Sequence, residues 1–251
     1  MPALPDGVGH STEVRGAGGL YTQPHWDADM PWVAQGITAR GGNMSLFTDT
    51  PVGDVLARWH ALRDALHCRI IVHSRQVHEA AVHVHRALPE GLLLAADADG
   101  HATRDVGVLL AVSVADCVPI NVVAPQARAL ALLHGGWRGI AAGILERGIA
   151  RLTEELGART AELRVHLGPA ICGECYEVGG AVVSGLGLPA VGPGTAHVDI
   201  RAVLARRARA LGVPAAHISV STHCTRHGDS PFYSHRGGCR ERQISVLALR
   251  A

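Results

Sequence analysis

The stretch from Val106 to Gly139, VGVLLAVSVADCVPINVVAPQARALALLHGGWRG, decides the fold of this chain of 251 residues. It holds three runs of strand length, Val106–Val114, Ile120–Val123 and Ala129–Leu133, that are apolar on both sides. Strands of this kind belong in a sheet that is covered on both faces. The stretch therefore predicts buried sheet at the centre of the protein.

Helices and further strands are predicted on either side of this stretch. Apolar spacing predicts helices over residues 52–66 and 139–156, the second ended by Gly157. A third helix is expected over 201–211, capped by Asp199. Further strands are expected at residues 36–40, 69–77, 81–84, 163–167, 218–221 and 244–249. The mixture predicts an α/β (α+β) protein, a compact sandwich of mixed sheet and helices.

The domain organisation is expected to be simple. Residues 1–34 show no clear period and are interpreted as a loose N-terminal segment. No sharp change of composition divides residues 35–251, which we interpret as a single catalytic domain. Residues 179–195, rich in Gly and Pro, are expected to form a long loop.

Composition excludes several function classes. The formal net charge is +1, so no global field attracts nucleic acid or an acidic membrane surface. All 23 basic residues are arginine, which removes lysine Schiff-base chemistry and the P-loop lysine. A bound anion must be met by arginine, histidine, backbone N–H groups or a metal. The arginines of the helix 201–211 are interpreted as a solvated surface, because no aromatic residues are interleaved with them.

The cysteine content is typical of a cytoplasmic protein. Six cysteines are too few for a dense disulfide framework of the secreted type. The N-terminal stretch shows no signal-peptide pattern, and no apolar run approaches the ~20 residues that span a bilayer. We therefore expect a cytoplasmic protein with reduced thiols and no membrane partner, in which cysteine serves a metal or catalysis.

The segment His134-Gly135-Gly136-Trp137-Arg138-Gly139 is the first candidate site. It lies between an apolar strand and an amphipathic helix, where backbone N–H groups and the helix dipole favour an anion. Gly135 and Gly136 allow a ligand to approach the backbone closely. The structural alternative is a tight strand-to-helix connection without a ligand.

The segment Ala115-Asp116-Cys117-Val118-Pro119 is the second candidate. Pro119 is expected to interrupt the strand ladder and bend the chain, which would present Cys117 at the edge of the sheet. The alternative is a buried structural cysteine.

His78, which ends Gln76-Val77-His78, is the third candidate, and spacing alone does not choose it over His73, His83 or His85. Two histidines and a cysteine from three strand ends would leave one tetrahedral position of a zinc ion open, as in catalytic sites. Sequence spacing cannot prove that such scattered ligands meet.

Cys172-Gly173-Glu174-Cys175 is a C-x-x-C pair, a pattern found in redox centres and in zinc fingers. No second C-x-x-C follows it. We therefore interpret Cys172 and Cys175 as ordinary loop thiols in preference to metal ligands.

Five motifs in order give the chain a family resemblance: QVH, ADCVP, HGGWRG, GPAICGECYEVG and CTRHGDSPFYSHRGGCRERQISVLAL. Together they resemble the YfiH or laccase-domain family, also known as multicopper polyphenol oxidase-like proteins and as purine nucleoside phosphorylases. The resemblance runs from about Gly36 to the C-terminus. It implies the α/β sandwich that is grouped with the cytotoxic necrotising factor deamidases.

The resemblance also implies a zinc ion held by His78, Cys117 and His134. The implied reactions are phosphorolysis of adenosine, inosine, guanosine and S-methyl-5'-thioadenosine, and deamination of adenosine at the same site. Zinc lowers the pKa of bound water toward ~7, which deamination requires. The partners are thus a purine nucleoside and phosphate. Copper is the less favoured metal, because multicopper centres normally need many histidines and a methionine-ligated site, whereas this chain has three methionines and no repeated H-x-H pattern beyond His83-x-His85.

The remaining site residues are our own assignments. Arg40 and Arg138, with the turn at Gly135 and Gly136, are expected to bind phosphate because the chain has no lysine. Arg236 is a further candidate. Asp116 is expected to orient a ligand histidine, and Glu177 to act as a catalytic acid or base. A metal-free thiolate–imidazole pair of Cys117 and His134, acting as a cysteine hydrolase or deamidase, stays open as an alternative.

Overall fold

The three apolar runs of the central stretch are strands, but they belong to two sheets. In the computed structural model, which describes residues 4–16, 19–190, 192 and 194–250, β9 (Val108–Val114) lies in one sheet, and β10 (Val118–Ala124) and β11 (Ala129–Gly135) lie in the other. The chain turns between the sheets at Asp116, whose φ of 83° is left-handed. The bend expected at Pro119 is therefore wrong in position, since Pro119 lies within β10 opposite His134.

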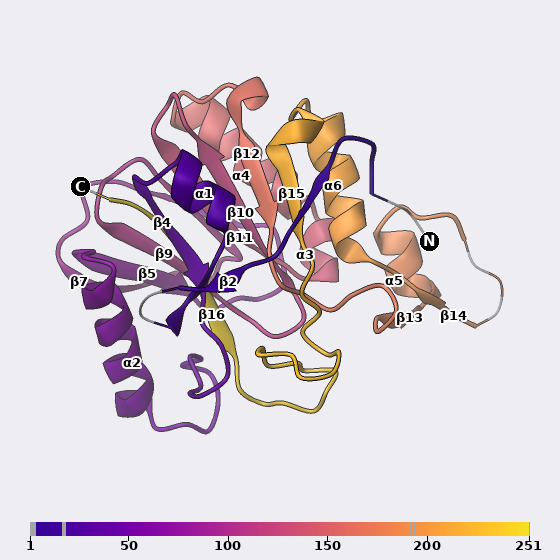
Figure 1. Ribbon diagram of the computed structural model, residues 1–251, viewed down its shortest axis with the longest axis horizontal. Helices are drawn as coiled ribbons and strands as arrows, with labels where there is room; N and C mark the ends of the chain where they lie inside the picture. The colour runs from indigo at the N-terminus through magenta and orange to yellow at the C-terminus, as the bar shows by residue number, and fades with distance from the viewer. Residues whose placement is uncertain (1–3, 17–18, 191, 193, 251) are drawn as a thin grey trace.

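The two large sheets have seven strands each and lie against one another (Figure 1). Sheet A has the order β1 (Gly9–Ser11), β15 (Ile218–Ser221), β12 (Arg164–Leu167), β10, β11, β8 (Gly100–Thr103) and β6 (Val82–His85). Sheet B has the order β2 (Val14–Arg15), β3 (Tyr21–Thr22), β4 (Val33–Ile37), β16 (Gln243–Leu249), β9, β5 (Ile70–Ser74) and β7 (Gly91–Ala95). A small ribbon joins β13 (Glu177–Gly179) to β14 (Thr195–His197). Both sheets mix parallel and antiparallel neighbours, so the predicted mixed α/β class is confirmed.

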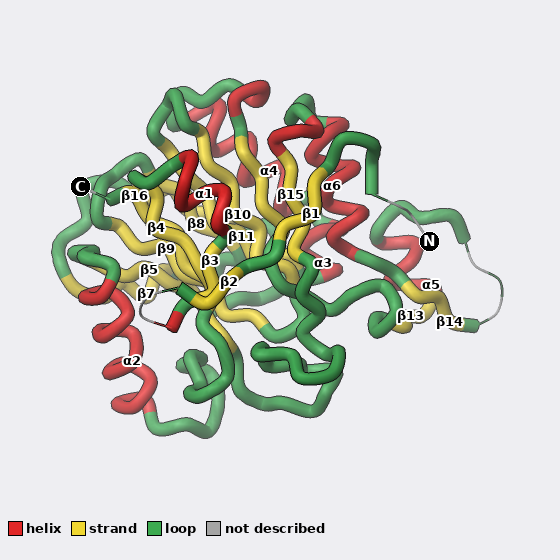
Figure 2. Tube along the Cα trace, in the orientation of Figure 1, coloured by secondary structure: helices red, strands yellow, loops and turns green. Residues whose placement is uncertain are grey.

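Helices cover the outer faces of both sheets, as the tube in Figure 2 shows. On sheet A lie α3 (Trp137–Ala141), α4 (Ile144–Ala150) and α6 (Ile200–Ala210), and α2 (Val52–Ala65) covers sheet B. Alternation along β9 explains the layers, because Leu109 faces α2 whereas Leu110 joins the core between the sheets. The short remaining elements are α1 (Pro24–Asp29), α5 (Gly180–Gly185), a π-helical turn (Arg151–Glu155) and two 3-10 turns (Thr160–Glu162 and Ala215–His217).

The helix predicted over residues 139–156 is broken into α3, α4 and the π-helical turn. The break comes at Gly143, whose φ of 86° is left-handed and ends the first helical segment. The long loop predicted over residues 179–195 contains α5, so that prediction is wrong in part. Asp199 caps α6 as predicted, accepting a hydrogen bond from the N–H of Arg201 at 2.9 Å.

The solvated surface predicted for the arginine-rich helix does not hold for Arg201. Its side chain is buried and donates to the carbonyl oxygens of Ser221 and His223 at 2.9 and 2.8 Å. None of the helices in the described part of the chain combines the length and hydrophobicity that crossing a bilayer requires.

The N-terminal segment contributes to both sheets. β1 pairs in parallel with β15 at the edge of sheet A, and β2 and β3 lie at the edge of sheet B. Between them the buried carboxylate of Glu13 lies 2.6 Å from Nε2 of His166. The division into residues 1–34 and a catalytic domain of residues 35–251 stays a prediction.

Candidate metal centre

His78, Cys117 and His134 come together where the strands of sheet A end. Cys117 directly precedes β10 and His134 lies near the end of β11, and these strands are antiparallel, so the two residues are neighbours. His78 comes from the loop after β5. One ligand atom from each of the three residues lies within 4.8 Å of the others. The two imidazole rings are close to perpendicular, with centroids 4.8 Å apart.

Asp99 organises this centre, although its only signal in the sequence is a carboxylate before a short strand. Its Oδ1 accepts a hydrogen bond from Nδ1 of His134 at 2.7 Å. Its carboxylate also accepts the backbone N–H groups of Val77, His78 and Glu79 at 2.9–3.1 Å. One buried carboxylate therefore fixes the ring of one candidate ligand and the loop of another, and it leaves Nε2 of His134 for a metal.

The loop that carries His78 is held at a second point. The side-chain amide of Gln76 accepts from the N–H of Ser113 at 2.7 Å and donates to its carbonyl oxygen at 2.9 Å, as a strand neighbour would. His78 itself adopts a left-handed φ of 60°, a conformation that histidine tolerates better than most residues. Both features turn the imidazole toward Cys117.

Gly136 makes room for the three side chains. A Cβ at Gly136 would lie 2.8 Å from Cδ2 of His78, 3.3 Å from Sγ of Cys117 and 3.5 Å from Cε1 of His134. Gly135 is equally confined, since a Cβ there would lie 2.9 Å from the carbonyl oxygen of Val118. The helix that follows, α3, has only five residues, so the strong dipole expected behind this turn is absent.

The charged forms of Cys117 and His134 stabilise each other. Burial alone raises the pKa of the Cys117 thiol, but the charge of His134 and hydrogen bonds from His134 and His78 hold it below its usual value. Burial alone lowers the pKa of His134, but Cys117 and Asp99 raise it above its usual value. The cysteine is thus disposed to be a thiolate, the form that binds metals and acts as a nucleophile.

A cavity of about 340 Å³ opens beside the three residues. Its lining includes Phe47, which is 54% exposed, and polar side chains that the sequence did not single out. These further lining residues are Ser45, Thr48, Arg75, Gln76, Ser113, His235 and Arg242. The cavity is therefore positively charged on part of its wall and aromatic at Phe47.

The other predicted site residues do not line this cavity. Arg40 is exposed, and its Nε donates to the carbonyl oxygen of Phe232 at 2.7 Å. Arg138 is exposed beside the ring of Trp137, at 4.5 Å from its centroid.

Arg236 and Glu177 lie together beside β13, outside the lining of the cavity. Nη1 of Arg236 donates to the carbonyl oxygen of Glu177 at 2.8 Å. The Glu177 carboxylate accepts a hydrogen bond from Thr195 on β14, and it does not line the cavity.

Asp116 does not orient a ligand histidine, so that prediction is wrong. Its carboxylate accepts hydrogen bonds from Oγ1 of Thr225 at 2.5 Å and from the N–H of Arg236 at 2.7 Å. Asp116 thereby fixes the turn before Cys117. The residue that orients a ligand histidine is instead Asp99.

The rival histidines lie elsewhere. His73 is buried against Trp59, with ring centroids 4.9 Å apart, and burial lowers its pKa to about 4. His83 and His85 lie on β6, where Nε2 of His85 is 3.0 Å from Nδ1 of His101. None of them belongs to a group of three or more candidate ligands within the described residues.

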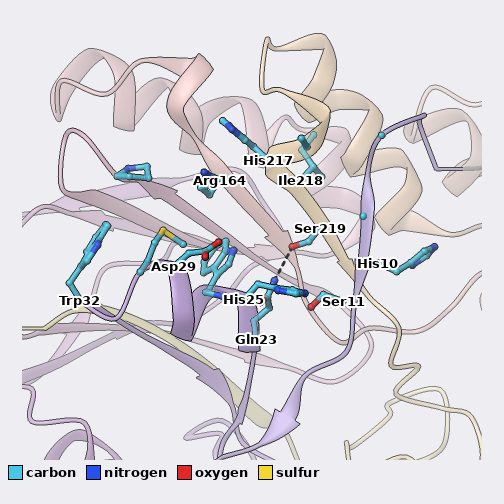
Figure 3. A pocket seen from close by; sticks show the side chains of 16 residues that line it. His10, Ser11, Gln23, His25, Asp29, Trp32, Arg164, His217, Ile218 and Ser219 are labelled. Carbon is cyan, nitrogen blue, oxygen red and sulfur yellow. Dashed lines mark hydrogen bonds between the residues drawn. The ribbon is translucent and has the colours of Figure 1, made fainter.

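A separate hollow of about 730 Å³ lies where the N-terminal segment crosses sheet A (Figure 3). Figure 3 shows Gln23 and Ser219 joined across it by a hydrogen bond, which measures 3.3 Å. Beneath it, His166 contacts Ser219 at 2.8 Å and Glu13 at 2.6 Å. These contacts fasten the N-terminal segment to the sheet and bring no cluster of candidate metal ligands together among the described residues.

Comparison with known proteins agrees with this geometry. Residues 34–250 match a family model described as multi-copper polyphenol oxidoreductase laccase. A relative called purine nucleoside phosphorylase YlmD, from Geobacillus stearothermophilus, is 38% identical over 61% of this chain and 60% of its own length. A relative called adenosine deaminase RL5, from an unknown prokaryotic organism, is 34% identical over 67% of this chain and 66% of its own length. The chain thus spans less than two thirds of these curated relatives.

Two solved structures show the same fold over nearly all of the chain. The crystal structure of YlmD from Geobacillus stearothermophilus matches with a TM-score of 0.85 and 30% identity, covering 96% of this chain and all of that one. The crystal structure of the Bacillus licheniformis protein YfiH matches with a TM-score of 0.85 and 24% identity, covering 95% of this chain and 99% of that one.

Proposed function

This chain belongs to the multi-copper polyphenol oxidoreductase laccase family, and from that premise we propose that it is a zinc-dependent purine nucleoside phosphorylase that also deaminates adenosine. The relatives' names supply the two reactions. The observation that carries the proposal is the convergence of His78, Cys117 and His134 beside an open cavity.

The residues at this centre fit a zinc ion. Two imidazoles and one thiolate are ligands that zinc accepts, and a set of three leaves one coordination position open. Gly136 leaves the space in which the three donors meet. A bound zinc ion would supply a Lewis acid with an open position. The chain's own part is to hold His134 through Asp99 and to keep Cys117 deprotonated beside His134.

Zinc is preferred to copper because of the donors around the cavity. Blue-copper sites add a weak axial ligand, usually methionine, to two histidines and a cysteine. No methionine from the described part of the chain lines the cavity. The other group of candidate ligands among the described residues, Cys172, Cys175, Cys224 and His227, is unlike the histidine-rich sets of laccases.

The nucleoside base is proposed to lie against Phe47. An exposed aromatic ring is a stacking surface for a purine, and Phe47 is packed from behind by His73 at 6.3 Å between ring centroids. His235 and Arg242 on the opposite loop supply hydrogen-bond donors for the sugar or the base.

Phosphate binding is proposed for arginines around the centre. Arg138 follows Gly136 by two residues, in the first turn of α3, and Arg236 is held over the ring of Tyr176 at 5.1 Å. Burial and the nearby charge of Cys117 raise the pKa of Tyr176, which supports a place for this ring near the metal centre. Arg40 completes the proposed set from the loop after β4, and Glu177 stays the proposed acid or base.

The test is to identify products from adenosine with and without phosphate. Phosphorolysis converts adenosine and phosphate into adenine and ribose 1-phosphate, whereas deamination gives inosine and ammonia. We expect both product sets, both lost when a chelator removes the metal and both restored by zinc. Full activity in metal-free protein would overturn the proposal.

The thiolate–imidazole alternative is favoured by the position of Cys117, whose Sγ lies within 4.8 Å of a ring nitrogen of the buried His134. It predicts activity in metal-free protein that is blocked by alkylation of Cys117. The chelator experiment therefore separates the two candidates directly.

A further inference from the structure

A second group of candidate ligands lies on the same edge of sheet A. Cys172, Cys175, Cys224 and His227 each offer an atom within 4.8 Å of the others. Their loops follow β12 and β15, which are parallel neighbours, so both loops leave the sheet at one edge. The C-x-x-C pair, interpreted from sequence as loop thiols, is thus completed by a C-x-x-H pair from the distant chain.

Both pairs form turns, closed in the first by N–H groups that donate to a carbonyl oxygen and in the second by N–H groups that point at sulfur. In the first turn, the N–H groups of Cys175 and Tyr176 donate to the carbonyl oxygen of Cys172 at 3.1 and 3.0 Å. In the second, Sγ of Cys224 accepts from the N–H of Arg226 at 3.4 Å and from the N–H of Cys172 at 3.3 Å. Such bonds stabilise a thiolate, and here they join the two turns to each other.

The spacing suits a tetrahedral ion. Ligands at ~2.0–2.3 Å from zinc and at tetrahedral angles lie roughly 3.6–3.8 Å from one another. The ring nitrogens of His227 lie 3.8 and 3.9 Å from Sγ of Cys172. The three thiols are free of disulfide bonds.

We propose that Cys172, Cys175, Cys224 and His227 bind a second zinc ion. Three thiolates and one imidazole complete a tetrahedral shell, so this site has no open position and its role is structural. Each thiol that binds the ion gives up its proton to solvent. The partly exposed ring of His227, beside the exposed carboxylate of Glu174 at 3.7 Å, offers the ion a route in.

The ion would stiffen one wall of the catalytic cavity. Thr225, next to ligand Cys224, donates to the carboxylate of Asp116 at 2.5 Å. Ile171, next to ligand Cys172, donates its N–H to the carbonyl oxygen of Asp116 at 3.1 Å. Asp116 is the residue before Cys117, so the second ion would hold the turn that presents the catalytic thiolate.

Metal counting on the purified full chain tests the proposal. We expect two zinc ions per chain, one in Cys117→Ser, one in Cys175→Ser, and none in the double variant. Cys239→Ser is the matched control, because Cys239 is a half-buried thiol outside both clusters, and it should keep both ions. No zinc in Cys117→Ser, with Cys175 intact and the protein folded by circular dichroism, would overturn the proposal.

Two further measurements keep the test decisive if Cys175→Ser folds poorly. Alkylation of the unmodified protein should spare Cys172, Cys175 and Cys224 until a chelator is added. His227→Cys should retain the second ion with four thiolates, whereas His227→Ala should bind it at least ~10-fold more weakly. A disulfide between any two of the three cysteines, or alkylation at equal rates with and without chelator, would contradict the proposal.

Discussion

Asp99 and His134 form the contact on which the candidate metal centre rests. Oδ1 of Asp99 lies 2.7 Å from Nδ1 of His134, and the carbonyl oxygen of Asp99 accepts the backbone N–H of His134 at the same distance. Both groups are buried. The pair sets which imidazole nitrogen faces Cys117, and the same carboxylate shapes the loop of His78.

Asp99→Asn should weaken metal binding by about 10- to 100-fold, because the carboxylate that orients His134 becomes a neutral amide. Zinc affinity measured by competition with a chromophoric chelator checks this. Asp64→Asn, which changes an exposed carboxylate paired with Arg63, should leave the affinity unchanged. Equal zinc affinity in the two variants would show that Asp99 does not orient His134 for the metal.

Gly136→Ala should abolish metal binding while the protein stays folded. The added methyl group would lie 2.8 Å from the ring of His78 and 3.3 Å from Sγ of Cys117, in the space where the ligands converge. Metal content and circular dichroism of the purified variant measure the two effects. Gly53→Ala, at a position in α2 with no atom within 4 Å of the new Cβ, is the control and should keep its metal.

Phe47→Ala should raise KM for adenosine with a smaller effect on kcat. Loss of one base-stacking surface costs ~1–3 kcal/mol, or roughly 5- to 150-fold in affinity. Steady-state kinetics on adenosine and inosine give the two parameters separately. Leu94→Ala removes a similarly exposed apolar side chain on β7 and should leave both unchanged. An unchanged KM in Phe47→Ala would place the base elsewhere.

Glu13→Gln should lower the free energy of unfolding by roughly 3 kcal/mol at pH 7, since it replaces a buried carboxylate that accepts hydrogen bonds from His166 and Ser221. Burial raises the pKa of Glu13, but the bonds and charge of His166 and the bond from Ser221 outweigh it, so the net pKa lies below 4.5. A carboxylate with a lowered folded pKa adds stability above its unfolded pKa and loses it as pH falls through the folded value.

The difference in free energy of unfolding between wild type and Glu13→Gln should therefore be largest at pH 7 and shrink below pH 4.5. Urea unfolding at several pH values measures it. Glu155→Gln, which breaks an exposed pair with Arg151, is the control and should change stability by less than ~0.5 kcal/mol. A difference that stays constant down to pH 3 would contradict the role of the Glu13 charge.

The sequence predicted most strands and the class of the fold, because hydrophobic runs report burial directly. It could not divide the strands between two sheets, since β9 and β10 are equally apolar and the turn at Asp116 carries no glycine. The predicted single helix failed at Gly143 because an isolated glycine inside a helical pattern does not reveal a left-handed conformation.

The candidate site, like the fold, could be predicted only in part. Family motifs placed His78, Cys117 and His134, and the structure brings them together. Asp99 escaped prediction because its role depends on a contact 35 positions along the chain. The cysteine cluster escaped because its second half, Cys224 and His227, meets the first only through the parallel pairing of β12 and β15.

Diffraction from a crystal of the purified protein, measured on both sides of the zinc absorption edge, decides whether His78, Cys117 and His134 share a metal ion. We expect an anomalous peak ~2.3 Å from Sγ of Cys117 and ~2.0–2.1 Å from one nitrogen each of His78 and His134. Active crystals with no metal among these three side chains, or with the side chains turned apart, would contradict it.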